Sequence, residues 1–188
     1  MSEGHAKDKR AQKTRHALLS AFFDLVMEKH RYDEITIGDI LARSGVGRST
    51  FYEHFASKDG LLASSLAGPF SILADTIRER DNTEHLTRLL EHFWGNRAMA
   101  RGTFVGAVRR KTMPVLVELI EERLKIDGAG KLSALIVPVR LAAIQLAEGL
   151  LAPTTAWLLG DAQCSPEALA LALRRTSRAT LSALEVPA

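Results

Sequence analysis

The chain has 188 residues, of which 46% are apolar and 25% carry a charged side chain. This composition is ordinary for a folded domain and excludes a chain that is mainly disordered. The single cysteine, Cys164, excludes an internal disulfide bond and a zinc site built from several thiolates. The formal net charge is only +3, so charge alone does not indicate a nucleic-acid partner.

The sequence shows no pattern typical of a targeting segment or a membrane span. Residues 1–16 are polar and lack the apolar core of a secretory signal. The uncharged apolar stretch at residues 149–160 has the length of a buried core helix rather than of a membrane-spanning one. We therefore expect a cytoplasmic protein with no membrane partner.

Apolar residues recur at helical spacing, and no segment alternates apolar and polar residues as a half-buried strand does. Near the N-terminus we predict helices over residues 9–29, 37–43 and 48–54. Thr36 should cap the second helix, because its hydroxyl can accept a hydrogen bond from a free N–H of the first turn. Gly45 should end that helix in the left-handed conformation, with Val46 buried behind it. Phe51 and Phe55 lie four residues apart and should hold the third helix to the core.

The remainder of the chain is predicted to be helical as well. Ser57 should cap a long helix that reaches about residue 80 and bends at an internal Gly-Pro pair. Residues 82–99 form the clearest amphipathic helix, with an apolar stripe of Leu86, Leu89, Leu90, Phe93 and Trp94. Pro114 should open a further helix, and Ser165 should cap the last one, with an apolar helix over residues 138–159 between them. The sequence thus predicts an all-α fold of about nine helices.

Two short helices joined by a glycine turn and braced by a third form a helix-turn-helix pattern. The second short helix would point several polar side chains outward: Arg48, Ser49, Thr50, Tyr52 and His54. Arg48 can contact guanine in a bidentate manner, and Ser49 or Thr50 can reach base edges or phosphates.

Other side chains of this segment have the chemistry of phosphate ligands. Tyr52, His54 and Lys58 can donate to phosphate oxygens, which positions a protein on DNA without reading its sequence. Lys58 also begins a helix, where free backbone N–H groups favour an anion. We therefore interpret the segment as a DNA-binding element.

The stretch ITIGDILARSGVGRSTFYEHFASKDGLL, residues 35–62, resembles the DNA-binding signature of the TetR/AcrR-type transcriptional regulators. The resemblance rests on Thr36, Ile40, Gly45, Val46, Thr50, Phe51, Tyr52, His54, Phe55, Ser57 and Lys58. It implies a helix-turn-helix domain over residues 1–58 and a helical effector-binding and dimerisation domain over residues 59–188. It also implies a homodimeric repressor that leaves a near-palindromic double-stranded operator when a small, largely apolar ligand binds.

The resemblance assigns roles to individual residues. It places Thr36 at a phosphate and Arg48 and Ser49 at base edges. Phosphate contacts are implied for Thr50, Tyr52, His54 and Lys58. Two glycines depart from the family pattern: Gly47 replaces a frequent Ser or Thr cap at small cost, and Gly38 removes a second-helix arginine that some members use to read bases.

A candidate effector site lies in the C-terminal part of the chain. Phe93, Trp94 and Phe104 are aromatic residues that line either a ligand pocket or the ordinary core. His92 and Arg97 are near enough in sequence to supply polar groups to such a pocket, which is otherwise expected to be apolar.

Two further choices remain open at this point. The basic residues Lys7, Lys9, Arg10, Lys13 and Arg15 form either an arm that reaches DNA or, as we favour, a solvated terminus. The C-terminal domain binds an effector or serves only for dimerisation or protein docking. An enzyme is not expected, because the sequence shows no catalytic constellation, no metal-ligand spacing and no cofactor motif.

Overall fold

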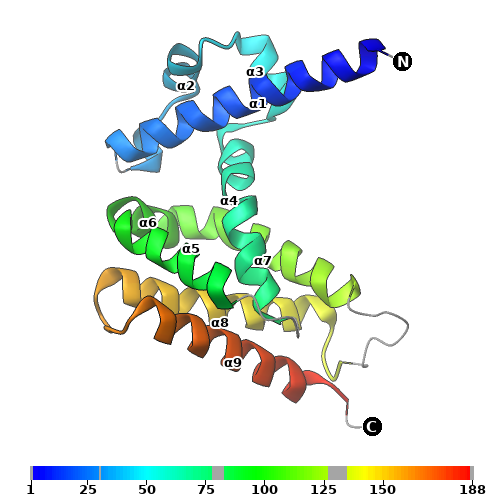
Figure 1. The fold of residues 1–188 in the computed structure, drawn as a ribbon, viewed down its shortest axis with the longest axis vertical. Coiled ribbons are helices and arrows are strands. Elements are labelled where there is room, and N and C mark those ends of the chain that lie inside the picture. The colour runs from blue at the N-terminus through cyan, green and yellow to red at the C-terminus, as the bar shows by residue number, and fades with distance from the viewer. Residues whose placement is uncertain (1, 30, 78–82, 127–134, 187–188) are drawn as a thin grey trace. The chain divides into compact units, whose positions relative to one another are not determined.

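The computed structural model describes residues 2–29, 31–77, 83–126 and 135–186 (Figure 1). Within these ranges the chain forms nine α-helices, two short 3-10 helices and a single isolated β-bridge between Leu135 and Glu185. The predicted all-α fold is therefore confirmed. The contacts divide the chain into two compact units, Met1–Ser65 and Leu66–Ala188, which are described separately below.

The N-terminal unit consists of three helices and the start of a fourth. They are α1 (Ser2–Lys29), the 3-10 helix η1 (Tyr32–Glu34), α2 (Ile37–Ser44), α3 (Arg48–His54) and the first turns of α4 (Lys58–Ala74). The helix α1 begins seven residues earlier than the apolar spacing predicted. Its first turns are rich in Ala, Lys, Arg and Gln, which favour a helix without forming an apolar stripe. The core of the unit consists of Leu18, Phe22, Ile35, Ile40, Phe51, Phe55 and Leu61.

The short helices begin and end where the sequence predicted. Thr36 caps α2, and Gly45 ends it with a φ of 68°, a conformation that costs glycine little. Gly47 precedes α3 without a side-chain cap, and the hydroxyl of Ser57 accepts from the backbone N–H of Gly60 at 3.1 Å at the start of α4. The prediction that Val46 is buried was wrong, because this side chain is only half-buried beside the turn.

The second unit contains the end of α4 and five further helices. After the 3-10 helix η2 (Asp75–Ile77) come α5 (Thr83–Gly95), α6 (Arg97–Phe104), α7 (Gly106–Ile126), α8 (Val139–Leu159) and α9 (Pro166–Leu184). Helix α8 packs against both α7 and α9 (Figure 1). Ser165 caps α9 as predicted, since its hydroxyl accepts from the backbone N–H of Ala168 at 3.2 Å.

Two predicted boundaries in this unit were wrong. The amphipathic helix over residues 82–99 is interrupted after Gly95, and Asn96 separates α5 from α6 with φ −113° and ψ 33°. Pro114 does not open a helix but lies inside α7, which begins at Gly106. Pro114 is exposed, so α7 continues past it with the loss of one backbone hydrogen bond. The predicted end of the long helix near residue 80 lies outside the described residues.

The segment Lys58–Ile77 is long and apolar enough to cross a membrane by length and composition alone, and it is the one such helix among the described residues. A core helix meets the same criterion. Phe70, Leu73 and Ala74 are fully buried in the core of the second unit, which supports the core assignment.

Candidate nucleic-acid interface

The helix α3 has one buried face and one exposed face. Phe51 is 0% exposed and lies 6.0 Å, between ring centroids, from the buried Phe55. Arg48, Ser49 and Tyr52 are exposed on the same helix, and Tyr52 lies four residues after Arg48 and three after Ser49, the spacing at which side chains on a helix are neighbours. A guanidinium, a hydroxyl and a phenol thus share the outward surface of this helix, as the sequence predicted.

Thr50 and His54 border this outward face. They are four residues apart on α3, and both are half-buried. Thr36 is exposed at the start of α2. The structure therefore leaves the polar groups of these three residues at or near the surface, and their contacts with DNA stay a prediction.

The start of α2 is fixed by a reciprocal capping box. The hydroxyl of Thr36 accepts from the backbone N–H of Asp39 at 3.1 Å, and the carboxylate of Asp39 accepts from the backbone N–H of Thr36 at 2.9 Å. The Thr36 hydroxyl still has its own O–H to donate, because it acts only as an acceptor in the cap. The hydrogen bond from the Thr36 backbone, followed by that from Lys29, lowers the pKa of Asp39 to about 2.

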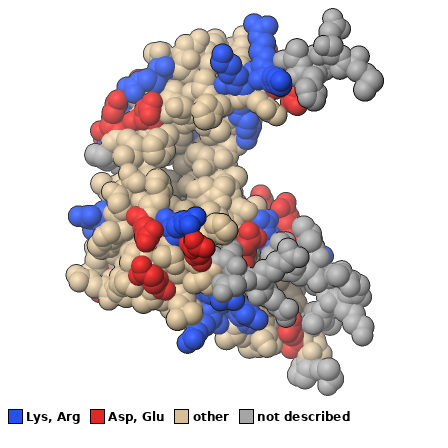
Figure 2. Space-filling model, viewed as in Figure 1, with Lys and Arg blue, Asp and Glu red and all other residues tan. Residues whose placement is uncertain are grey.

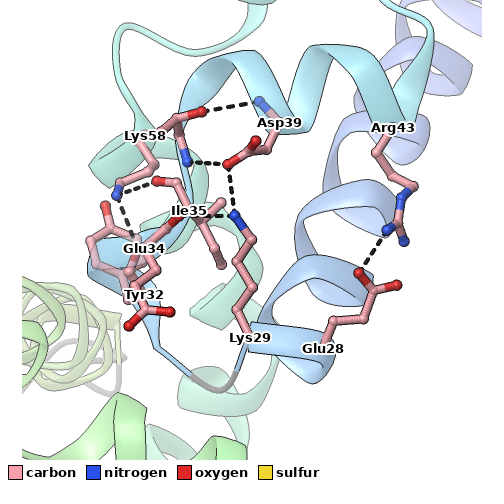
Figure 3. A network of polar contacts seen from close by, with 9 residues as sticks. Glu28, Lys29, Tyr32, Glu34, Ile35, Asp39, Arg43 and Lys58 are labelled. Carbon is pink, nitrogen blue, oxygen red and sulfur yellow. Dashed lines mark hydrogen bonds and ion pairs between the residues drawn. The ribbon is translucent and has the colours of Figure 1, made fainter.

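Side chains from α1 hold both ends of α2 (Figure 3). The ammonium group of Lys29 donates to the Asp39 carboxylate at 3.0 Å and to the carbonyl of Glu34 at 3.0 Å. Arg43, near the end of α2, pairs with Glu28 at 2.7 Å, and this hydrogen bond lowers the pKa of Glu28. The helix that carries Thr36 is thus tied to α1 at two points.

Lys58 does not lie as the sequence predicted for a phosphate ligand. Its ammonium group donates to the backbone carbonyls of Tyr32, at 3.0 Å, and Ile35, at 2.6 Å (Figure 3). It also lies 4.0 Å from the centre of the Tyr32 ring. The Tyr32 hydroxyl in turn donates to Asp59, and burial followed by this hydrogen bond raises the pKa of Tyr32. The side chain of Lys58 therefore makes its contacts within the N-terminal unit.

The basic residues near the N-terminus lie on α1. Lys9, Arg10 and Lys13 are exposed on this helix, and the side chain of Lys7 lies outside the described residues. Arg15 differs, because it donates to the hydroxyl of Ser64 at 2.6 Å and lies 4.9 Å from the centre of the Phe55 ring. Figure 2 shows acidic as well as basic side chains on the N-terminal unit, so the visible surface of this unit is not uniformly positive.

The five candidate effector residues separate into two groups. Phe93 and Phe104 are buried and lie 5.3 Å apart between ring centroids, and Phe104 also lies 6.1 Å from Phe70. His92, Trp94 and Arg97 are exposed, so the expected apolar stripe does not bury Trp94. Trp94 lies between the Arg97 guanidinium, 5.3 Å from its ring centre, and Trp157 at 4.7 Å.

Sequence reasoning missed several residues of the interface network, among them Asp39, Tyr32 and Asp59. Asp39 was recognisable, because a Thr followed three positions later by an acid is a capping-box pattern. Tyr32 and Asp59 were not recognisable, since they are 27 positions apart in the chain and meet only in the folded unit.

A buried anchor, an exposed polar face on α3 and a capped α2 joined by a glycine turn define a helix-turn-helix DNA-binding protein. Residues 26–64 match the profile of the family described as "Bacterial regulatory proteins, tetR family". The N-terminal segment therefore matches the DNA-binding domain of this family, as the sequence pattern indicated, and the chain is similar to solved TetR regulators over nearly its whole length.

Similar proteins support the assignment. Over 59 residues the chain is 46% identical to an HTH-type transcriptional regulator of Bacillus subtilis (strain 168), YxbF, a match that covers 31% of this chain and 16% of that protein. The solved TetR regulator from Streptococcus agalactiae 2603V is 26% identical, with a TM-score of 0.56 over 98% of this chain and 100% of that one. TylP, a TetR regulator from Streptomyces fradiae, is 26% identical, with a TM-score of 0.55 over 94% of this chain and 88% of that one.

Proposed function

We propose that the protein is a homodimeric, cytoplasmic repressor that reads a near-palindromic operator through α3 and leaves it when a small ligand binds the C-terminal domain. The observation that carries the DNA-binding part is the exposed face of α3, with Arg48 and Ser49 as base-reading residues. The proposed phosphate contacts come from Thr36, Thr50, Tyr52, His54 and Lys58. The side chain of Lys58 makes hydrogen bonds within the N-terminal unit. We therefore assign its proposed phosphate contact to its backbone N–H at the start of α4.

The proposed domains follow from this division of labour. Residues 1–58 are assigned to DNA binding and residues 59–188 to effector binding and dimerisation. The helix α4 begins at Lys58 and passes without interruption through the boundary between the compact units at Ser65. A continuous helix of this kind is able to transmit a displacement between the domains, which is what ligand-dependent release of DNA requires.

The proposed dimer interface lies on α8 and α9. Leu141, Ile144 and Leu159 are exposed on α8, and Leu171 is exposed on α9. Large apolar side chains on two neighbouring helices of one unit are typical of a surface that a second copy covers. Dimerisation would let two copies of α3 read two half-sites of one operator.

A version without a small effector is supported by a separate observation. Phe93 and Phe104, two of the proposed pocket residues, pack on one another and on Phe70 as core residues do. A screen of small apolar compounds by thermal shift distinguishes the two versions. A compound that raises the melting temperature and releases the DNA supports the effector version, whereas compounds that do neither support the version with dimerisation alone.

The DNA-binding function is tested with a duplex that the unaltered protein selects from random-sequence DNA. Arg48→Ala should weaken binding to the selected duplex by about 5- to 150-fold per copy, as expected for loss of one base contact. Arg88→Ala is the matched control, because it removes the same charge from an exposed ion pair on α5. If no duplex is selected, or if the two variants bind alike, the proposed function is wrong.

The dimer is tested by light scattering on a sizing column. The unaltered chain should elute with twice its monomer mass, and Leu141→Glu with Leu171→Glu should give a monomer, because two buried charges in one interface are costly. Phe23→Glu, at an exposed apolar residue of α1, serves as the control and should leave the mass unchanged.

A further inference from the structure

The connection between α1 and α2 is held through its backbone carbonyls. Tyr32 to Ile35 form η1 and its C-cap, and their carbonyl oxygens point toward lysine side chains from two different helices (Figure 3). Lys29 of α1 donates to the Glu34 carbonyl, while Lys58 of α4 donates to the Tyr32 and Ile35 carbonyls. Three carbonyls within four residues thus accept hydrogen bonds from ammonium groups.

Lys58 makes the shortest of these contacts. Its side chain is half-buried, its ammonium group lies over the face of the buried Tyr32 ring, and 2.6 Å separates it from the Ile35 oxygen. Hydrogen bonds from a charged donor are stronger than those between neutral groups, and the ring face adds a cation–π attraction. The group is thus held on the inner side of the unit by three separate contacts.

These contacts connect the two places where α2 and α4 begin. Ile35 immediately precedes Thr36, whose hydroxyl caps α2 and is a proposed phosphate ligand. Lys58 is the first residue of α4, and the next residue, Asp59, accepts from the Tyr32 hydroxyl. The first turn of α4 therefore makes hydrogen bonds to the segment that positions the first turn of α2.

We propose that Lys58 is a positioning residue for DNA binding. Its ammonium group fixes the position of Thr36 relative to the start of α4 and does not contact a phosphate. This inference rests on the proposed function, because it requires that Thr36 and α3 meet DNA. In this role the Lys58 ammonium group fixes the positions of neighbouring residues and neutralises no phosphate of the DNA backbone.

The salt dependence of binding separates this role from a phosphate contact. Each phosphate neutralised by a lysine contributes about 0.9 to the slope of log K against log salt concentration, so two copies of such a lysine contribute about 1.8. Lys58→Met should therefore weaken binding to the selected duplex by about tenfold while the slope stays within about 0.5 of that of the unaltered protein.

Lys125→Met is the control, because it removes one lysine charge from an exposed position on α7 and leaves the N-terminal unit untouched. A salt slope that falls by about 1.8 in Lys58→Met would show that the Lys58 side chain contacts a phosphate and would overturn the proposal. A folded Lys58→Met variant with a lower melting temperature but unchanged affinity would overturn it too, since the lysine would then serve stability only.

A second measurement uses the unaltered protein and so does not depend on a variant that folds. Amine-labelling reagents should modify the exposed Lys9 and Lys13 but leave Lys58 protected, both in the free protein and on the selected duplex. Rapid labelling of Lys58 in the free protein, with protection only on DNA, would contradict the proposal. If the unaltered protein selects no duplex, the proposed function itself fails, and labelling of the free protein still reports where the ammonium group lies.

Discussion

Replacing Thr36 with alanine removes one half of the capping box and leaves the other half in place. The hydrogen bond from the Asp39 backbone N–H to the Thr36 hydroxyl, 3.1 Å long, is lost. The bond from the Thr36 backbone N–H to the Asp39 carboxylate, 2.9 Å long, does not need the threonine side chain. Loss of a threonine N-cap costs about 1 kcal/mol, within a range of about 0.5–2 kcal/mol. We therefore expect Thr36→Ala to reduce the free energy of unfolding by this amount.

The expected shift in melting temperature depends on how the two units unfold. One kcal/mol corresponds to about 4–8 °C if the N-terminal unit melts separately, and to about 2–4 °C if both units melt together. Circular dichroism followed against temperature measures the shift. Thr36→Ser is the control, because it keeps the hydroxyl and should retain most of the stability. Equal melting temperatures for Thr36→Ala and the unaltered protein, or an equal loss for both variants, would refute the reasoning.

Three further predictions concern the same unit. Phe51→Ala should cost about 3–5 kcal/mol in chemical denaturation, whereas Tyr52→Ala, at a side chain that is 48% exposed, should cost far less; similar losses would contradict the packing of α3. Gly45→Ala should destabilise the protein by about 1 kcal/mol because the φ of Gly45 is 68°, although nothing lies within 4 Å of the added methyl group. The control Gly60→Ala, at an ordinary φ, should be neutral or stabilising. A neutral Gly45→Ala would show that the turn relaxes. Hydrogen bonds lower the pKa of Asp39 from 3.8 to about 2, so the stability they provide is complete above about pH 4 and is lost as the pH falls to about 2. Asp39→Asn should therefore lower the melting temperature at neutral pH, with a difference that closes toward pH 2; a difference that persists there would refute the assignment.

Local rules predicted the helix-turn-helix well because its signals lie within a few residues of one another. Thr36 and Gly45 bracket one short helix, and both act on backbone groups in their own turn. Phe51 and Phe55 are spaced to share a face, and the structure buries both. The same rules placed Arg48 and Ser49 on the outward side, where the structure exposes them.

The same rules were less successful in the second unit. A proline is usual at a helix start, but Pro114 lies inside α7, where the surrounding packing outweighs the loss of one hydrogen bond. The stripe over residues 82–99 continues in sequence, yet the chain changes helix at Asn96. Helical spacing also could not tell the buried Phe93 from the exposed Trp94, because adjacent residues at the edge of a stripe differ only in what packs against them.

By itself, the sequence determined the class of fold, the likeness of the N-terminal segment to the TetR family, the caps of α2 and α9, and the outward face of α3. These features depend on apolar spacing and on side chains that act on nearby backbone groups. Only the tertiary structure decided which groups the Lys58 side chain contacts. Its position at the start of a helix had indicated that it binds an anion. The carbonyls that its ammonium group contacts lie 26 and 23 residues earlier in the chain, so folding alone brings them together. A lysine ammonium group donates to the acceptors that the fold places near it, and these acceptors cannot be identified from the neighbouring sequence.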